Sequence, residues 1–203
     1  EHLDYHGSVE QYRRDKARLF EMLTQDLAGR GQALEANKSR KFAIVNADDP
    51  HHTMFLDAAP ATAERLSYAV HQNADVRATE IVSTRNGLRF MVSTPWGTRP
   101  ARLQLTGDFN VHNSLAALTV ALAEGVDLDA ALAALGDVTG VRGRMERIEA
   151  GQSYTVLVDY AHTPGSFEKL MGIVRPLTYG RLIAVFGSAG ERDREKRPIQ
   201  GAV

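Results

Sequence analysis

Short, mostly apolar runs that lead through polar turns into helices constrain the fold of this chain most strongly. Residues 42–45, 155–158 and 182–186 form such runs, which are typical of buried strands in a parallel sheet. Each run is followed by polar turn residues and then by a helical pattern. This succession of strands and helices predicts an α/β fold with parallel strands.

The middle of the chain has a different pattern. Alternating apolar residues run through 81–105, with a hairpin signal at Asn86-Gly87 and a second turn at 95–97. We therefore expect three antiparallel strands with one packed face. Two helices should follow, over 107–125 and from Asp127 to 136. Leucines recur in both at helical spacing, Gly125 and Gly136 mark their ends, and Asp127 is the cap of the second.

Turn-forming residues near 137–143 separate this region from the final strands and helices. We expect a domain boundary there, with one domain over residues 1–140 and a second over 141–203. The first should open with a helix over 8–23 that begins with a capping box. In the second, Thr163-Pro164 has the composition of a helix start, a cap followed by proline.

Composition excludes several classes of function. The chain of 203 residues has no cysteine, so disulfides and thiolate metal sites are excluded, and its formal net charge is −1. This charge gives no general attraction to nucleic acid. No apolar run approaches the roughly 20 residues that cross a bilayer, and no signal peptide is visible, although the chain lacks an initiator Met. We expect a cytoplasmic protein.

Lys16 lies on the apolar side of the first predicted helix, between Tyr12 and Leu19. A buried ammonium is unfavourable unless it is paired or neutral. One interpretation is a lysine whose stem packs while its head reaches water. The other is a neutral amine that has reacted with CO2, because the resulting carbamate can ligate a divalent cation. His2, in the loop before this helix, could supply a nitrogen to a nearby metal.

Two further motifs carry side chains suited to a nucleotide. Asn110 and Asn113 share one face at a helix start, and carboxamides match the donor and acceptor edge of adenine. The alternative is ordinary capping by Asp108 or Asn110. Asp159 follows the strand at 155–158, where it could hold a ribose hydroxyl. Its alternative role is to cap the next helix, although Thr163 suits that task.

Two more candidate sites, both for binding anions, contain arginines. Arg144, at the predicted domain boundary, could clamp phosphate charge or could be a surface charge. A glycine-rich turn at 187–190 leads to a basic segment that begins at Arg192 and could bind a carboxylate or phosphate. A solvated basic helix face is the alternative. The turn does not fit the phosphate-binding loop G-x-x-x-x-G-K-[ST], which is absent from the whole chain.

Six stretches occur in the order of one enzyme family: HLDYHG, NADDP, GDFNVHNSLAA, GRMERI, VDYAHTP and FGSAGERDREKRP. Together they resemble the Mur ligases, ATP-dependent amide-forming enzymes of peptidoglycan synthesis. Within the family, the chain looks like the type that adds the third amino acid. The resemblance implies the later part of the ATP-binding central domain and the start of a Rossmann-like C-terminal domain.

The resemblance also implies residue roles. His2 matches a metal-associated histidine, and Lys16 matches a lysine that is carbamylated and ligates magnesium. Asn110 and Asn113 match the pair that contacts adenine. Arg144 matches an arginine on the nucleotide phosphates. Asp159 matches the acid that binds the ribose. Arg192 matches the arginine that receives a carboxylate of the incoming diamino acid.

The implied activity joins a diamino acid, meso-diaminopimelate or L-lysine, to UDP-N-acetylmuramoyl-L-alanyl-D-glutamate. ATP and Mg²⁺ are the implied cofactors, and the intact enzyme is expected to be a monomer. In the family, the phosphate-binding loop precedes the HLDYHG stretch, so we expect this chain alone not to turn over ATP. A folylpolyglutamate synthase-like ligase and a non-catalytic nucleotide-binding module of the same fold are the alternatives.

Overall fold

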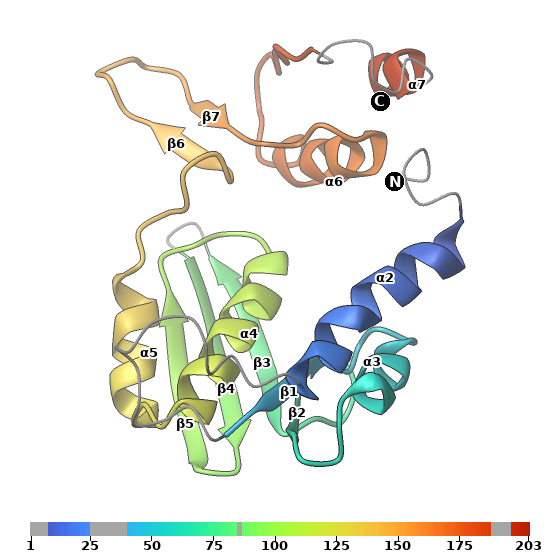
Figure 1. Ribbon diagram of the computed structural model, residues 1–203. Coiled ribbons are helices and arrows are strands. Elements are labelled where there is room, and N and C mark those ends of the chain that lie inside the picture. Colours follow the sequence, from blue (N-terminus) through green and yellow to red (C-terminus); the bar gives the residue numbers. More distant parts are fainter. Residues whose placement is uncertain (1–7, 25–39, 85–86, 188–195) are drawn as a thin grey trace, which may run out of the picture. The chain divides into compact units, whose positions relative to one another are not determined.

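The computed structural model describes residues 8–24, 40–84, 87–187 and 196–203 (Figure 1). The described residues fall into two compact units, Ser8–Thr139 and Gly140–Val203. No helix in these residues is long and apolar enough to cross a membrane.

The first unit is built on a mixed sheet in which the strands lie in chain order, β1-β2-β3-β4-β5. The pairs β1–β2 and β2–β3 are parallel, whereas β3–β4 and β4–β5 are antiparallel. The strands are β1 (Phe42–Asn46), β2 (Glu64–Ala69), β3 (Val76–Thr84), β4 (Gly87–Thr94) and β5 (Gly97–Leu103). The α/β prediction and the three antiparallel strands are confirmed, and these strands join the parallel ones in a single sheet.

The antiparallel strands are paired up to the residues that flank their connections. Thr84 pairs with Gly87 across the first hairpin, and Thr94 pairs with Gly97 across the second. Gly87 has a φ of +122°, and a Cβ at this position would lie 1.9 Å from the carbonyl oxygen of Leu103. Only glycine fits this position without moving the neighbouring strand.

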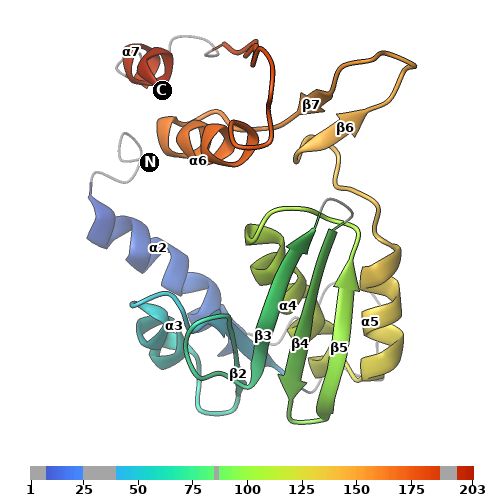
Figure 2. The same ribbon diagram turned by 180° about the vertical axis from the view of Figure 1, so that it is seen from behind.

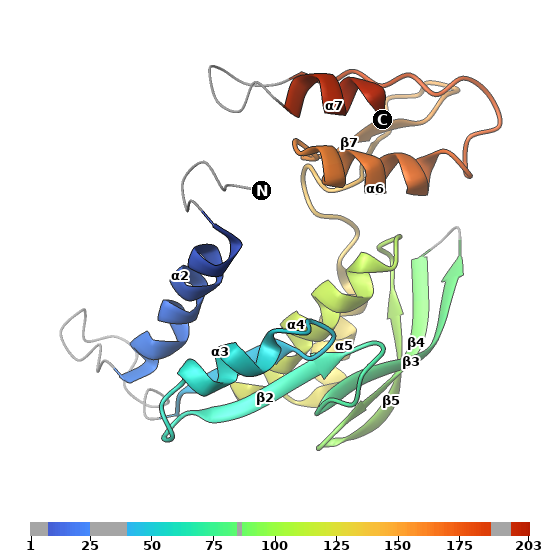
Figure 3. The same cartoon turned by 90° about the vertical axis from the view of Figure 1, so that its right-hand side faces the viewer.

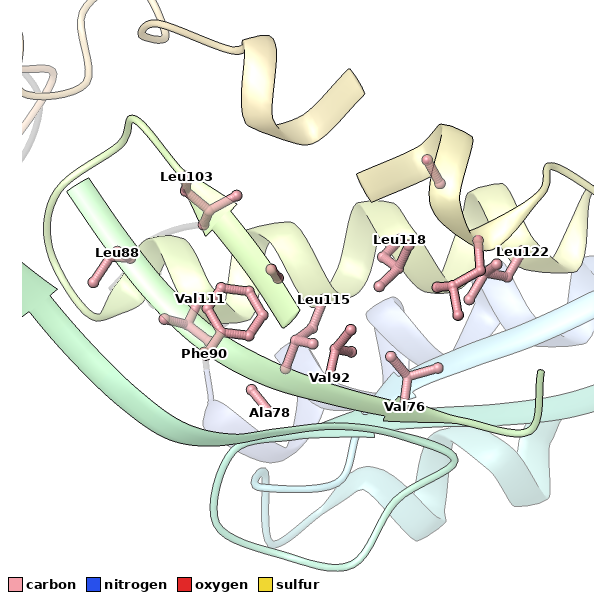
Figure 4. Packing of buried hydrophobic residues seen from close by; sticks show 13 residues of the cluster. Val76, Ala78, Leu88, Phe90, Val92, Leu103, Val111, Leu115, Leu118 and Leu122 are labelled. Carbon is pink, nitrogen blue, oxygen red and sulfur yellow. The ribbon is translucent and has the colours of Figure 1, made fainter. Parts of the chain in front are cut away.

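Helices α4 (Phe109–Ala123) and α5 (Leu128–Asp137) pack on the sheet of the first unit, and Figure 2 shows this unit from behind. Side chains of β4 and α4 form most of the core, as Figure 4 shows. Alternate residues of β4 and residues three or four apart on α4 meet there, which is the pairing expected from their periods. The buried members from these two elements are Leu88, Phe90, Val92, Val111, Leu115, Leu118 and Leu122.

Helices α4 and α5 have at their ends the residues that the sequence predicted there. Gly125, with a φ of +84°, follows the last turn of α4. The Asp127 carboxylate caps α5 by accepting hydrogen bonds from the amides of Asp129 and Ala130, both at 3.0 Å. α5 continues one residue beyond the predicted end at Gly136.

Helix α2 (Val9–Glu21) continues into the 3-10 turn η1 (Met22–Thr24) and packs against α3 (His52–Ala58), as Figure 3 shows. Ser8 caps α2 by accepting a hydrogen bond from the Gln11 amide at 3.1 Å. The predicted apolar face is partly wrong, because Leu19 is 69% exposed while Ala17 is buried. Phe20 contacts Phe55 of α3, so the packed stripe is centred on Ala17 and Phe20.

The second unit contains a two-stranded antiparallel sheet and two helices. These are β6 (Glu146–Ile148), β7 (Val156–Val158), α6 (Pro164–Val174) and α7 (Lys196–Ala202). The predicted start of α6 is confirmed: Thr163 and Ser166 form a reciprocal capping box, with proline in the first turn.

Two predictions for this unit are wrong. Residues 155–158 were expected to form a buried parallel strand, but β7 pairs antiparallel with β6 and is largely exposed. Residues 182–186 form no strand, and Val185 is 96% exposed. A parallel strand needs neighbouring strands as well as helices over its faces. Phe186 contacts Phe167 of α6, but no described strand of this unit pairs with residues 182–186.

Candidate functional site

The amino end of α4 brings together the two asparagines that the sequence singled out. The side chain of Asn110 is buried, and its Nδ2 donates a hydrogen bond to the Thr106 carbonyl at 2.7 Å. Its Oδ1 accepts a hydrogen bond from Asn113 Nδ2 at 3.1 Å. The capping alternative is wrong, because the Asp108 side chain makes no capping bond and Asn110 lies inside the helix.

The two carboxamides differ in their hydrogen bonds within the chain. Asn110 is held by the chain itself, with bonds on both its nitrogen and its oxygen. Asn113 is exposed and uses one N–H to contact Asn110. A carboxamide has two N–H donors and one acceptor oxygen. Asn113 can therefore present a donor and an acceptor together, which is the pattern that an adenine edge requires.

Asp48, in the NADDP stretch after β1, is the most strongly hydrogen-bonded carboxylate among the described residues. Its oxygens accept bonds from three consecutive backbone amides between β2 and β3, Val70 at 2.7 Å, His71 at 3.0 Å and Gln72 at 2.8 Å. A fourth bond comes from His112 Nε2 on α4 at 3.1 Å. Asp48 thus joins three segments of the first unit that are far apart in the sequence.

The environment of Asp48 acts on its pKa in two directions. Burial of the side chain, which is only 11% exposed, disfavours the charged form and acts to raise the pKa. The three backbone amides and His112 outweigh burial and lower the pKa to about 2. Asp48 is therefore a carboxylate throughout the physiological pH range. The sequence prediction missed this role, since only the fold brings the four donors to one carboxylate.

The neighbouring Asp49 makes only local hydrogen bonds among those that the structure describes. Its carboxylate accepts a hydrogen bond from the His51 amide at 2.8 Å, and its carbonyl accepts one from the His52 amide at 3.0 Å. These bonds form the turn that leads into α3. The two acids of NADDP thus separate into a turn residue and a residue that links β1 to α4.

Lys16 is exposed on α2, with its Nζ 5.4 Å from the centroid of the Tyr12 ring. This contact with a ring on the preceding turn is a cation–π arrangement. No group of three or more His, Cys, Asp or Glu side chains that could hold a metal ion occurs in the part of the chain that the structure describes. Carbamylation of Lys16 and magnesium binding by this chain stay predictions.

In the second unit, Asp159 and Arg144 lie in one corner. The Asp159 carboxylate accepts hydrogen bonds from the amides of Met145 and Ala161, both at 2.8 Å. These bonds hold the turn that contains Arg144 against the segment after β7. The guanidinium of Arg144 is exposed and lies 5.5 Å from the centroid of the Tyr160 ring.

This corner has the charges that a nucleotide would need. Arg144 presents an exposed cation, suited to phosphate oxygens. Each oxygen of Asp159 accepts one backbone bond and keeps a second lone pair, to which a ribose hydroxyl could donate. His2 and Arg192 lie outside the described residues, so their predicted roles stay predictions.

Two family models match the chain: the Mur ligase middle domain over residues 1–121 and the Mur ligase glutamate ligase domain over residues 143–203. The chain is 72% identical over its full length to a UDP-N-acetylmuramyl-tripeptide synthetase from Roseiflexus sp. (strain RS-1). It is therefore an α/β chain that matches two domain models of one ligase family. It belongs to the Mur ligase family, as the sequence motifs predicted.

Solved structures agree with this assignment. A structure of a UDP-N-acetylmuramoyl-L-alanyl-D-glutamate–2,6-diaminopimelate ligase matches 98% of this chain with a TM-score of 0.66 and 32% identity. A folylpolyglutamate synthetase from Lactobacillus casei matches 72% of the chain with a TM-score of 0.58, but at 17% identity it shows a shared fold alone. The chain spans 39% of the Roseiflexus protein and 38% of each of these two structures.

Proposed function

We propose that this chain is part of an ATP-dependent amide ligase of peptidoglycan precursor synthesis. The reaction adds a diamino acid, meso-diaminopimelate or L-lysine, to UDP-N-acetylmuramoyl-L-alanyl-D-glutamate. The observation that carries the proposal is the 72% identity along the whole chain to a tripeptide synthetase. The structural relative at 32% identity is named for the 2,6-diaminopimelate reaction, which favours that amino acid.

The proposed chemistry has two steps. The free carboxylate of the dipeptide attacks the γ-phosphate of ATP, which forms an acyl phosphate and releases ADP. The amine of the diamino acid then attacks the acyl carbon, and phosphate leaves with the bonding electrons as the amide forms. A proton leaves the attacking amine in this second step.

Charge is the main obstacle to the first step, because a carboxylate must approach a polyanionic phosphate. Preorganised cations reduce this repulsion. In our proposal, the exposed guanidinium of Arg144 binds the nucleotide phosphates. Mg²⁺ would supply the remaining positive charge. His2 and a carbamate on Lys16 are the proposed ligands from this chain, in a site that other parts of the enzyme complete.

The remaining roles concern recognition. We assign adenine to the Asn110–Asn113 pair, in which Asn113 offers its donor and acceptor to the base. Asp159 is assigned to the ribose hydroxyls. Arg192, in the basic segment, is assigned to a carboxylate of the incoming diamino acid.

A chimaeric enzyme tests this proposal. The chain replaces the matching segment of the Roseiflexus synthetase, to which it aligns over 203 residues. We expect ADP release that requires both the UDP-muramoyl dipeptide and a diamino acid, with a tripeptide product seen by mass spectrometry. Comparison of meso-diaminopimelate with L-lysine identifies the amino acid. The isolated 203-residue chain serves as a control and should not turn over ATP.

Two results would overturn the proposal. A folded chimaera without dipeptide-dependent ADP release would contradict a ligase role and favour a nucleotide-binding module. ADP release that depends on a folate and glutamate would favour the folylpolyglutamate alternative, which shares the fold.

A further inference from the structure

We propose that Asp48, acting through His112, is a positioning residue for the Asn110–Asn113 pair. The inference rests on the proposed function, because it takes this pair as the adenine contact. It concerns a carboxylate outside the residues to which the sequence assigned a role.

Asp48 is itself rigidly held. Three consecutive amides, of residues 70–72, donate to its two oxygens at 2.7 to 3.0 Å. Its own amide donates to Asn46 Oδ1 at the end of β1, also at 3.0 Å. Because the donors belong to the backbone beside the sheet, the carboxylate has a fixed place and orientation. The side chain is also largely buried, which strengthens these bonds relative to bonds in water.

His112 lies between the two asparagines in the sequence of α4. Its Nε2 donates to Asp48 Oδ2 at 3.1 Å, and its ring is partly buried. Hydrogen bonds to an ionised carboxylate are stronger than neutral ones. The bond therefore fixes the rotation and height of the first turns of α4 relative to the sheet.

Helix α4 lacks a side-chain cap at its amino end. The Asp108 side chain does not cap it, whereas the side chain of Asp127 caps α5 with two bonds. The amino end of α4 is instead held from its sides, by the Asn110 bond to the Thr106 carbonyl and by the His112 bond to Asp48. Together with the buried side chains of Val111 and Leu115, these lateral bonds set where Asn113 points.

The consequence is a chain of contacts from the sheet to the base. Asp48 orients His112, His112 places the turn of α4, and Asn110 orients the exposed Asn113 carboxamide. Loss of the His112 contact should displace Asn113 while leaving the core residues of α4 in place. Displacements on the order of 1 Å at a recognition group reduce rates by up to about 100-fold.

The test uses the active chimaera with His112→Ala and His112→Gln. Glutamine retains an N–H donor on a side chain of similar reach, so it should restore the contact. We expect His112→Ala to raise the KM for ATP about tenfold, with the KM for the dipeptide nucleotide within about twofold, and His112→Gln to reverse most of this rise. His51→Ala, at an exposed histidine before α3, is the matched control and should change neither constant.

A second measurement on the 203-residue chain does not depend on activity. The side-chain NH2 resonances of Asn113 should shift in His112→Ala and in Asp48→Asn but not in His51→Ala. Unchanged Asn113 resonances and an unchanged KM for ATP in His112→Ala would overturn the inference while the proposed function stands. If the parent chimaera lacks ligase activity, the proposed function fails, and the role of the pair in adenine binding fails with it.

Discussion

The replacement Asp48→Asn tests how much one buried carboxylate contributes to folding. Asparagine has the shape of a protonated aspartic acid, so the variant mimics the form that Asp48 adopts at very low pH. One oxygen becomes an NH2 group, which then faces two donors: either the pair from Val70 and His112 or the pair from His71 and Gln72. The variant therefore loses both the charge and half of the acceptor capacity.

The pKa of Asp48 sets the expected magnitude. A decrease from the usual value of 3.8 to about 2 on folding corresponds to about 2 kcal/mol of stability at neutral pH. Because the folded-state pKa is the lower one, this stability is present above pH 3.8 and is lost as the pH falls towards 2. At pH 3 about 1 kcal/mol should remain.

Urea denaturation followed by circular dichroism, at pH 7, 5 and 3, measures this dependence in the 203-residue chain. We expect Asp48→Asn to lower the free energy of unfolding by about 2 kcal/mol at pH 7 and by about 1 kcal/mol at pH 3. Asp57→Asn, at an exposed acid on α3, is the control and should stay within about 0.5 kcal/mol of the parent. An equal destabilisation at all three pH values would refute the electrostatic reasoning, as would no destabilisation at pH 7.

Three further predictions concern single positions. In the chimaera, Lys16→Ala should abolish ligase activity, and short carboxylic acids should restore part of it; full activity without them would exclude the carbamate. Gly87→Ala should destabilise the chain by at least about 2 kcal/mol, because its Cβ would lie 1.9 Å from the Leu103 oxygen. Gly125→Ala, which also has a positive φ but open space, should lose only about 1 kcal/mol; equal effects in urea denaturation would contradict the steric argument. Thr163→Ala should remove the cap of α6 and lower stability by about 1 kcal/mol, measured in the same way.

The elements that the sequence predicted correctly depend on local signals. α4 and α5 have leucines at helical spacing and end-marking residues such as Gly125 and Asp127. The hairpin at Gly87 and the capped start of α6 are equally local, since the interacting groups lie within a few residues. Interactions of this range depend little on the rest of the chain, so a pattern of adjacent residues is enough to predict them.

The strands show where local signals fail. The sequence of β2 begins with two charged residues and has no continuous apolar run, so it does not predict a strand. In the structure only one of its residues is buried. Residues 182–186 have the opposite property, an apolar run that the structure leaves exposed without a strand. Whether an extended segment becomes a strand depends on the availability of a neighbouring edge, which is a property of the assembled sheet.

The sequence by itself determined the family, through six ordered motifs, and the residue types available for binding a nucleotide. Only the tertiary structure decided how those residues are held. Asp48 and His112 are separated by 64 positions, and the carboxylate receives its other bonds from amides more than twenty residues away. The bonds form because the sheet and α4 pack together, and hydrophobic burial drives this packing without regard to separation in the sequence.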